Sequence, residues 1–311
     1  MPSLSPKLEV NLGGVVMKNP VAAASGTCGY GDIYTEFYSP AELGALVTKG
    51  ISLQPRAGNP TPRMAETPAG MLNAIGLENV GLKTFLAEKL PPLRDQGVTV
   101  IVNFFGHTED EYVKLADALS AAEGVAGLEA NISCPNVKAG GLEFGTDHKT
   151  AGKLVRKIKK ACAKPLWVKL SPNVTDIAAI AKEVEQAGAD AISAINTLKG
   201  MAIDLEARRP ILANVTGGLS GPAIKPIALR MVHEVARAVK VPVIGLGGIM
   251  TAKDALEFLV AGASAVQVGT ASFVDPRAPI QIIAGIKDYM REKQIQKVRD
   301  ITGTLKTNPR H

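Results

Sequence analysis

Short hydrophobic runs alternate with amphipathic helical patterns along most of the chain, most regularly from about residue 97 onward. Each run is rich in apolar and β-branched residues and spans only four to six positions, which is typical of buried parallel strands. The eight runs are Val21–Ala24, Ala45–Thr48, Val98–Asn103, Gly127–Asn131, Leu166–Leu170, Ala191–Ile195, Val243–Leu246 and Ala265–Val268. Eight strands with intervening helices are what a (β/α)8 barrel requires, so we predict this α/β fold.

The helical patterns between these runs carry start and stop signals. Thr108 and Glu111 have the spacing of a capping box at the start of one helix. Apolar residues then repeat every three or four positions, at Tyr112, Leu115, Ala116 and Leu119. Two later helical patterns end in Gly188 and Gly262, just before the next strand. Glycine accepts the left-handed conformation that terminates a helix, so both positions predict a helix end.

Three segments depart from this alternation. Leu8–Met17, with Gly13 and Gly14 at its centre, predicts an N-terminal β-hairpin that plugs the floor of the barrel. Leu53–Leu77 is rich in Pro, Gly and polar residues and is too long for a simple connection, so it predicts a protruding functional insertion after strand 2. Val137–Gly145 contains two adjacent glycines and predicts a mobile lid.

The length of 311 residues suits one barrel with an insertion, and no segment resembles a linker. We therefore expect a single domain over residues 1–311. The first residues, Met1–Lys7, lack the basic and apolar regions of a signal peptide, and no apolar run is long enough for a membrane helix. These features predict a soluble cytoplasmic protein.

The net charge of +6 comes from 35 Lys and Arg against 29 Asp and Glu. Positive charge suits a nucleic-acid-binding protein, but the aromatic residues that stack on bases make up only 4% of the chain. The densest basic stretch, Lys149–Lys169, also holds Leu154, Val155 and Ile158 at helical spacing. It predicts an amphipathic helix with a solvated basic face, so we favour an enzyme over a nucleic-acid-binding protein.

Asn, Lys and Gly dominate the C-terminal ends of the predicted strands, where the active sites of such barrels form. The residues at these ends are Ser25 and Gly26, Thr48–Gly50, Asn103, Asn131, Lys169, Asn196 and Thr197, Gly247 and Gly248, and Gly269 and Thr270. Asn offers both a donor and an acceptor, and Lys neutralises an anion. This ring predicts a planar, amide-rich ligand that carries negative charge.

Glycine turns follow the last two strands, at Gly247–Gly248 and Gly269–Thr270, and a third, Gly217–Pro222, precedes a predicted helix. Backbone N–H groups in such turns can bind a phosphate. Alternatively, each glycine only permits a tight turn, but their joint occurrence at strands 7 and 8 favours a phosphate site. The GxGxxG pattern of a dinucleotide site is missing after the first strand.

Three cysteines, Cys28, Cys134 and Cys162, lie far apart and form no CxxC pair. We therefore expect no disulfide framework, no zinc site and no iron–sulfur cluster held by this chain alone. Cys28 and Cys162 are expected to be inert core residues.

Cys134 differs because it lies just past the end of strand 4. Its thiol could serve as a nucleophile or as a general base. A nucleophilic cysteine usually has a nearby histidine, and none of the histidines lies at a strand end, although His107 and His148 are in adjacent loops. We favour the general base.

Two long motifs identify a family resemblance. Residues 131–138, NISCPNVK, and residues 59–77, NPTPRMAETPAGMLNAIGL, closely resemble the dihydroorotate dehydrogenases of pyrimidine biosynthesis, and the resemblance spans nearly the whole chain. A cysteine at the base position resembles class 1. The sequence NVKAGG from Asn136 and the sequence NAIGL from Asn73 resemble type 1B within that class.

The resemblance implies ligand roles for matching positions. The residues implied to bind the pyrimidine and its carboxylate are Lys49, Asn73, Ala74, Ile75, Gly76, Leu77, Asn131, Asn136, Asn196 and Thr197. The residues implied to hold FMN are Ser25, Lys49, Gly50, Asn103, Asn131, Lys169, Ile195, Gly221, Gly247, Gly248, Gly269 and Thr270. The glycine turns would take the FMN phosphate, and Lys169 would offset negative charge on the reduced flavin.

The resemblance also implies a mechanism and a partner. Cys134, as a thiolate, would remove the C5 proton of dihydroorotate while C6 delivers hydride to FMN. The ordinary thiol pKa of about 8.5 leaves little thiolate at neutral pH, so activity should rise with pH. Type 1B enzymes are homodimers of catalytic subunits joined in a heterotetramer with a subunit that carries FAD and a [2Fe–2S] cluster, through which electrons reach NAD⁺.

Three alternatives remain at this stage. A type 1A homodimer would use fumarate directly. A flavin-free lyase or isomerase barrel would use the phosphate site for a sugar phosphate, and its protein would be colourless. A nucleic-acid-binding protein would show strongly salt-dependent binding to DNA or RNA.

Overall fold

Eight parallel strands close into a barrel, which confirms the predicted fold. The computed structural model describes residues 6–133, 135–136 and 142–306. The barrel strands are β3 (Val21–Ala23), β4 (Ala45–Val47), β7 (Val100–Phe104), β8 (Val125–Asn131), β11 (Leu166–Lys169), β12 (Ala191–Ala194), β17 (Val243–Leu246) and β18 (Ala265–Val268). Each pairs in parallel with the next, and β18 pairs with β3 to close the ring. The observed bounds differ from the predicted ones by at most two residues.

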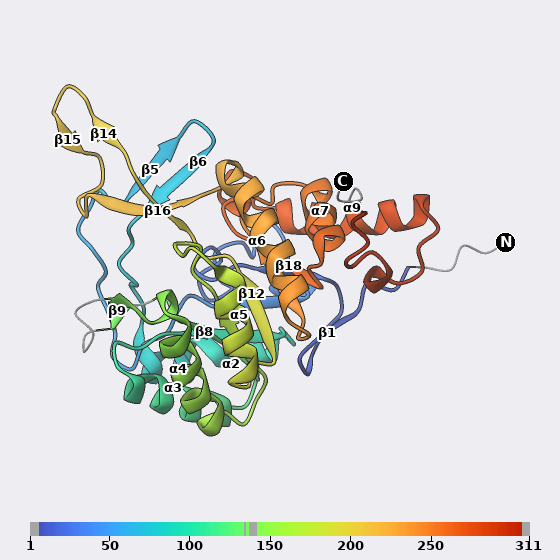
Figure 1. Ribbon diagram of the computed structural model, residues 1–311, viewed down its shortest axis with the longest axis horizontal. Coiled ribbons are helices and arrows are strands. Elements are labelled where there is room, and N and C mark those ends of the chain that lie inside the picture. The colour runs from blue at the N-terminus through green and yellow to red at the C-terminus, as the bar shows by residue number, and fades with distance from the viewer. Residues whose placement is uncertain (1–5, 134, 137–141, 307–311) are drawn as a thin grey trace.

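Helices between the strands surround this barrel (Figure 1). They are α1 (Gly81–Thr84), α2 (Leu90–Asp95), α3 (Glu109–Ala121), α4 (His148–Ala161), α5 (Ile177–Gln186), α6 (Lys225–Ala238), α7 (Ala252–Ala261), α8 (Ala271–Val274) and α9 (Ala278–Glu292). Gly188 and Gly262, which follow α5 and α7, have φ angles of 105° and 126°. The two predicted glycine stops are therefore confirmed.

The start of α3 keeps only half of the predicted capping box. Thr108 Oγ1 accepts a hydrogen bond from the backbone N–H of Glu111 at 3.2 Å. The Glu111 carboxylate instead accepts from the backbone N–H of His107 at 2.7 Å, one residue earlier than the capping box requires. The helix still begins where the sequence indicates, because both side chains satisfy N–H groups at this end.

The basic stretch forms a helix that is shorter than the stretch itself. Helix α4 ends at Ala161, so Lys164 lies in the connection that follows it and Lys169 in β11. Leu154, Val155 and Ile158 are buried, as the periodicity predicted. On the opposite face, Lys153 and Lys157 pair with Glu109 of α3.

The N-terminal hairpin closes the floor of the barrel, as predicted. Strands β1 (Val10–Leu12) and β2 (Val15–Met17) pair in antiparallel fashion. The indole N–H of Trp167, inside β11, donates to the carbonyl oxygen of Leu12 at 3.1 Å. A Cβ atom on Gly13, whose φ is 63°, would lie only 2.2 Å from the backbone oxygen of Asp190. Only glycine lets the hairpin turn approach the N-terminal end of β12 this closely.

Two insertions, rather than one, build an antiparallel sheet at the opposite end of the barrel. The predicted insertion contains β5 (Met64–Thr67) and β6 (Gly70–Asn73), and a second one after β12 contains β13 (Leu198–Met201), β14 (Ile203–Asp204), β15 (Arg209–Pro210) and β16 (Thr216–Ser220). The strand order β13-β16-β6-β5 joins the two insertions in one sheet. In Figure 1 the hairpins β5–β6 and β14–β15 project from the same end of the molecule. The second insertion was missed at the sequence level.

Only part of the predicted lid can be placed. Residues 137–141 lie outside the described residues, and the flanking strands β9 (Pro135–Asn136) and β10 (Leu142–Glu143) pair in antiparallel fashion. The lid and the single-domain assignment both remain predictions. Within the described residues, no helix is long and apolar enough to cross a membrane.

Candidate active site

A cavity of about 680 Å³ lies at the C-terminal ends of the barrel strands. Both insertions contribute to its wall, through residues of β6 and β16. The sequence-predicted residues that line it are Ser25, Lys49, Gly50, Asn73, Ala74, Ile75, Gly76, Leu77, Asn103, Asn131, Lys169, Ile195, Asn196, Thr197, Gly221, Gly247, Gly248, Gly269 and Thr270. Of the remaining two, Cys134 lies outside the described residues, and Asn136 is placed in β9. The structure therefore gathers in one cavity residues that are as far apart in sequence as Ser25 and Thr270.

Three glycine turns converge at one side of this cavity. Gly221, Gly247 and Gly248 have φ angles of 91°, 123° and 75°. A Cβ atom on Gly248 would lie 2.9 Å from the carbonyl oxygen of Gly221, so the turns after β16 and β17 touch. Thr270, after β18, donates through Oγ1 to Ser220 Oγ at 2.8 Å. Three turns held this close together form a backbone-lined pocket of the kind that binds a phosphate.

Asparagine side chains form a hydrogen-bonded group at the end of β8. Asn131 Oδ1 accepts from the side-chain amide of Asn196 at 3.3 Å and from the backbone N–H of Ser133 at 3.2 Å. Asn196 Oδ1 in turn accepts from the backbone N–H of Thr197 at 2.8 Å. The Asn73 amide donates to the carbonyl oxygen of Gly218 at 3.3 Å, which joins β6 to β16. These contacts orient amide groups that can read the edge of a planar ring.

Lys169 brings a buried positive charge to the cavity. Only 6% of this residue is exposed, and within the described ranges its side-chain ammonium group takes part in no ion pair or hydrogen bond. Burying an unpaired charge is costly, so a lysine in this position favours an anionic or electron-rich ligand beside it.

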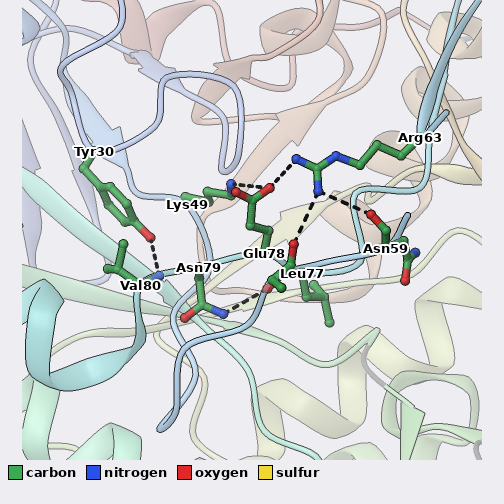
Figure 2. A network of polar contacts seen from close by, with 9 residues as sticks. Tyr30, Lys49, Asn59, Arg63, Leu77, Glu78, Asn79 and Val80 are labelled. Atoms are coloured by element: carbon green, nitrogen blue, oxygen red, sulfur yellow. Dashed lines mark hydrogen bonds and ion pairs between the residues drawn. The ribbon is translucent and has the colours of Figure 1, made fainter. Parts of the chain in front are cut away.

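A second charged group lies at the wall of the cavity, as Figure 2 shows. Arg63 Nη2 lies 2.5 Å from Glu78 Oε2, and the same oxygen lies 3.8 Å from Lys49 Nζ. All three residues line the cavity. The side-chain amide of Asn59 donates to the backbone oxygen of Ala74 at 2.9 Å, within the same insertion. Arg63 and Glu78 therefore connect the insertion to Lys49.

Sequence reasoning missed Arg63, Glu78 and one further residue, Glu129. Glu129 is fully buried in β8 and accepts hydrogen bonds from the side chains of Asn103, Ser193 and Gln267. The available signal was a charged residue two positions before the strand-end Asn131, on the face that points into the barrel. Arg63 lies within the quoted motif at residues 59–77, but no spacing rule pairs it with Glu78.

The two described cysteines are core residues. Burial raises the pKa of the Cys28 thiol to about 11. Burial also raises the pKa of Cys162, whose Sγ donates to the backbone oxygen of Lys164 at 3.1 Å. Thiols that stay protonated at neutral pH are poor nucleophiles. Within the described residues, no three His, Cys, Asp or Glu side chains gather as a metal site.

Comparison with known proteins gives a consistent result. Residues 7–290 match the model of the family described as dihydroorotate dehydrogenase. The chain is 58% identical over 301 residues to the dihydroorotate dehydrogenase B (NAD(+)), catalytic subunit, of Geotalea daltonii, which covers 97% of this chain and 99% of that protein. The proteins of the same name from Trichlorobacter lovleyi and Geobacter sulfurreducens are 59% and 58% identical. They cover 97% and 96% of this chain, and 99% and 98% of their own lengths.

Proposed function

Because the chain belongs to the dihydroorotate dehydrogenase family, we propose that it is the catalytic subunit that oxidises dihydroorotate to orotate in pyrimidine biosynthesis, with NAD⁺ as the final electron acceptor. The observation that carries this proposal is the cavity. It combines a glycine-turn pocket, a buried lysine without a described partner and a group of oriented asparagines. A flavin-free sugar-phosphate enzyme would account for the glycine-turn pocket but not for the group of asparagines that can bind the edge of a planar ring.

FMN suits this cavity, and two observations support the fit. Lys169 is a buried cation without a described partner, and the buried Gln267 Oε1 accepts no hydrogen bond within the described residues. We propose that Gly221, Gly247, Gly248, Gly269 and Thr270 hold the phosphate of FMN. Ser25, Lys49, Gly50, Asn103, Asn131, Lys169 and Ile195 hold the rest of the molecule. When bound, FMN supplies the acceptor for the hydride that leaves C6 of dihydroorotate.

The substrate residues act by positioning the pyrimidine. In this proposal Lys49 neutralises the substrate carboxylate, and amides of Asn73, Asn131, Asn136 and Asn196 bind the ring, together with Thr197 and the backbone of residues 74–77. Cys134, as a thiolate, is the base that takes the C5 proton of dihydroorotate. Its role rests on the motif at residues 131–138, since Cys134 itself lies outside the described residues.

The route of the electrons requires a partner. We propose that a subunit carrying FAD and a [2Fe–2S] cluster joins a homodimer of this chain in a heterotetramer. The catalytic-subunit names of the relatives support this assignment. A type 1A homodimer that reduces fumarate is the alternative.

Co-purification and acceptor assays test the proposal. The chain is purified alone and after co-expression with the products of neighbouring genes, and dihydroorotate oxidation is measured with NAD⁺ and with fumarate. We expect bound FMN in both preparations, and NAD⁺-dependent turnover only in the preparation with the partner. Turnover of fumarate by the isolated chain would support type 1A instead, and a colourless chain without flavin would overturn the proposal.

A further inference from the structure

Glu129 is the centre of a buried polar cluster in the barrel interior. None of its surface is exposed. Its Oε1 accepts from the Asn103 amide at 2.8 Å, and its Oε2 accepts from Ser193 Oγ at 2.6 Å and from the Gln267 amide at 2.7 Å. The three donors come from β7, β12 and β18, so the carboxylate connects strands on different sides of the barrel.

This cluster determines which way two amides face. Asn103 and Gln267 both donate to Glu129 through their side-chain NH₂ groups, so their side-chain oxygens face away from it. Both residues line the cavity, while Ser193 does not appear in its lining. Asn103 Oδ1 faces Gly50, where an added Cβ atom would lie 2.9 Å from this oxygen.

Gln267 Oε1 is left without a partner. The residue is 1% exposed, and this oxygen is buried with no hydrogen bond in the described part of the chain. A buried acceptor without a donor costs about 1–3 kcal/mol. Native proteins rarely leave such an atom unsatisfied. An acceptor held rigidly at the wall of a binding cavity therefore indicates a donor on the ligand.

We propose that Glu129 is a positioning residue that orients Gln267, so that Gln267 Oε1 accepts a hydrogen bond from the bound flavin. This inference rests on the proposed FMN site. The flavin offers two kinds of donor, the N–H of its ring and the hydroxyl groups of its ribityl chain. Gln267 lies in β18, two residues before Gly269, so its strand leads directly into the glycine turns.

Substitutions at the three positions separate orientation from stability. Gln267→Met keeps the length of the side chain but removes the acceptor. Glu129→Gln offers one acceptor and one donor group, so at least one of the three neighbouring donors loses its partner and an amide is free to turn. Ser193→Ala is the matched control, because it removes a hydrogen bond to Glu129 without altering an amide that lines the cavity.

The measurements are FMN affinity, from fluorescence titration of flavin-free protein, and the thermal unfolding midpoint of that flavin-free protein. We expect Gln267→Met and Glu129→Gln each to weaken FMN binding about tenfold. Ser193→Ala should lower the unfolding midpoint but leave the FMN affinity within about twofold. In the double variant, the effect of Glu129→Gln on affinity should be much smaller than in the wild-type background, because both changes act through the same oxygen.

Lumiflavin has the flavin ring but neither the ribityl chain nor the phosphate. Comparing its binding with that of FMN therefore identifies which flavin group donates to Gln267. An equal loss of affinity for lumiflavin and FMN in Gln267→Met assigns the ring N–H, and a loss for FMN alone assigns a ribityl hydroxyl. Wild-type affinity in Gln267→Met would overturn the inference, and this variant decides the question even if Glu129→Gln does not fold. If Ser193→Ala lost as much FMN affinity as Glu129→Gln, the role of Glu129 would be structural and not one of positioning Gln267. Failure of the wild-type chain to bind FMN would instead overturn the proposed function.

Discussion

The guanidinium group of Arg63 lies 2.5 Å from the carboxylate of Glu78, although the two residues are 15 positions apart in the chain. The same Glu78 oxygen lies 3.8 Å from the ammonium group of Lys49 (Figure 2). The side chains of Arg63 and Glu78 are 28% and 37% exposed, so the pair itself contributes little to folding stability. Its consequence is geometric, because it holds the insertion and Lys49 at one side of the cavity.

We predict that Arg63→Ala raises KM for dihydroorotate roughly three- to tenfold, with kcat and FMN content nearly unchanged. Without Arg63, Glu78 is free to neutralise Lys49 more completely and to compete with the substrate carboxylate. Steady-state kinetics of the holoenzyme measure the effect. Arg56→Ala is the control, since Arg56 is an exposed residue of the same insertion outside the cavity lining. An unchanged KM in Arg63→Ala, or an equal rise in both variants, would contradict this role.

Lys169→Met should weaken FMN binding about 30-fold or more, because it removes the buried positive charge beside the proposed flavin site. The reduction potential of any flavin that stays bound should become more negative, since the reduced form carries more negative charge. Flavin titration and potentiometry measure the two effects. Lys160→Met, which changes an exposed lysine of α4, should have neither effect. Wild-type flavin occupancy and potential in Lys169→Met would exclude the assigned role.

The floor hairpin gives a prediction for stability. Gly13→Ala should lower the free energy of unfolding by about 3 kcal/mol or more, because its Cβ atom would clash with the backbone of Asp190. Gly97→Ala is the matched control, since Gly97 has a similar φ of 69° but open space around it. Gly97→Ala should lower the free energy of unfolding by only about 1 kcal/mol. Urea unfolding of the flavin-free protein compares the two variants. Equal losses of unfolding free energy would show that the close contact between the hairpin and Asp190 is unimportant for stability.

Alkaline pH should destabilise the protein through Cys28. Burial raises the pKa of the folded thiol from a reference value of 9.0 to about 11, so between these values the unfolded state releases a proton that the folded state keeps. The stabilising contribution is therefore complete below pH 9 and is lost as the pH rises toward 11. The loss should reach about 2 kcal/mol near pH 10.5. Urea unfolding across this range should show a shallower decline for Cys28→Ala, whereas identical slopes would contradict the assignment.

The barrel could be predicted because its signals are local. Buried parallel strands such as Val243–Leu246 form short runs without polar side chains. Gly188 and Gly262 mark the helix ends before two of the strands. The second insertion escaped because its strands are short and partly exposed. Leu198–Met201 alternates between half-buried and exposed positions, and its pairing partner, Thr216–Ser220, is half-buried throughout and contains two adjacent glycines.

The residues of the site could be predicted where a polar or charged side chain lies at the C-terminal end of a strand, as Asn103 and Lys169 do. Glu129 was not, because its role depends on donors from three other strands, and Gln267 is 138 residues away in the chain. From the local sequence alone, a glutamate inside an apolar run is read only as an interruption of the predicted strand. The barrel gives it three hydrogen-bond donors and no contact with solvent.

The most direct test of the proposed function is whether dihydroorotate, in the absence of oxygen, reduces the flavin that we propose the chain binds. The purified wild-type chain and Cys134→Ser are each mixed with dihydroorotate, and flavin absorbance and orotate are followed in time. We predict rapid bleaching of the wild-type flavin with one orotate formed per flavin. Cys134→Ser should bind FMN and orotate normally but show little reduction near neutral pH. A wild-type flavin that dihydroorotate does not reduce would contradict the proposed activity, and wild-type rates in Cys134→Ser would contradict the assignment of the base.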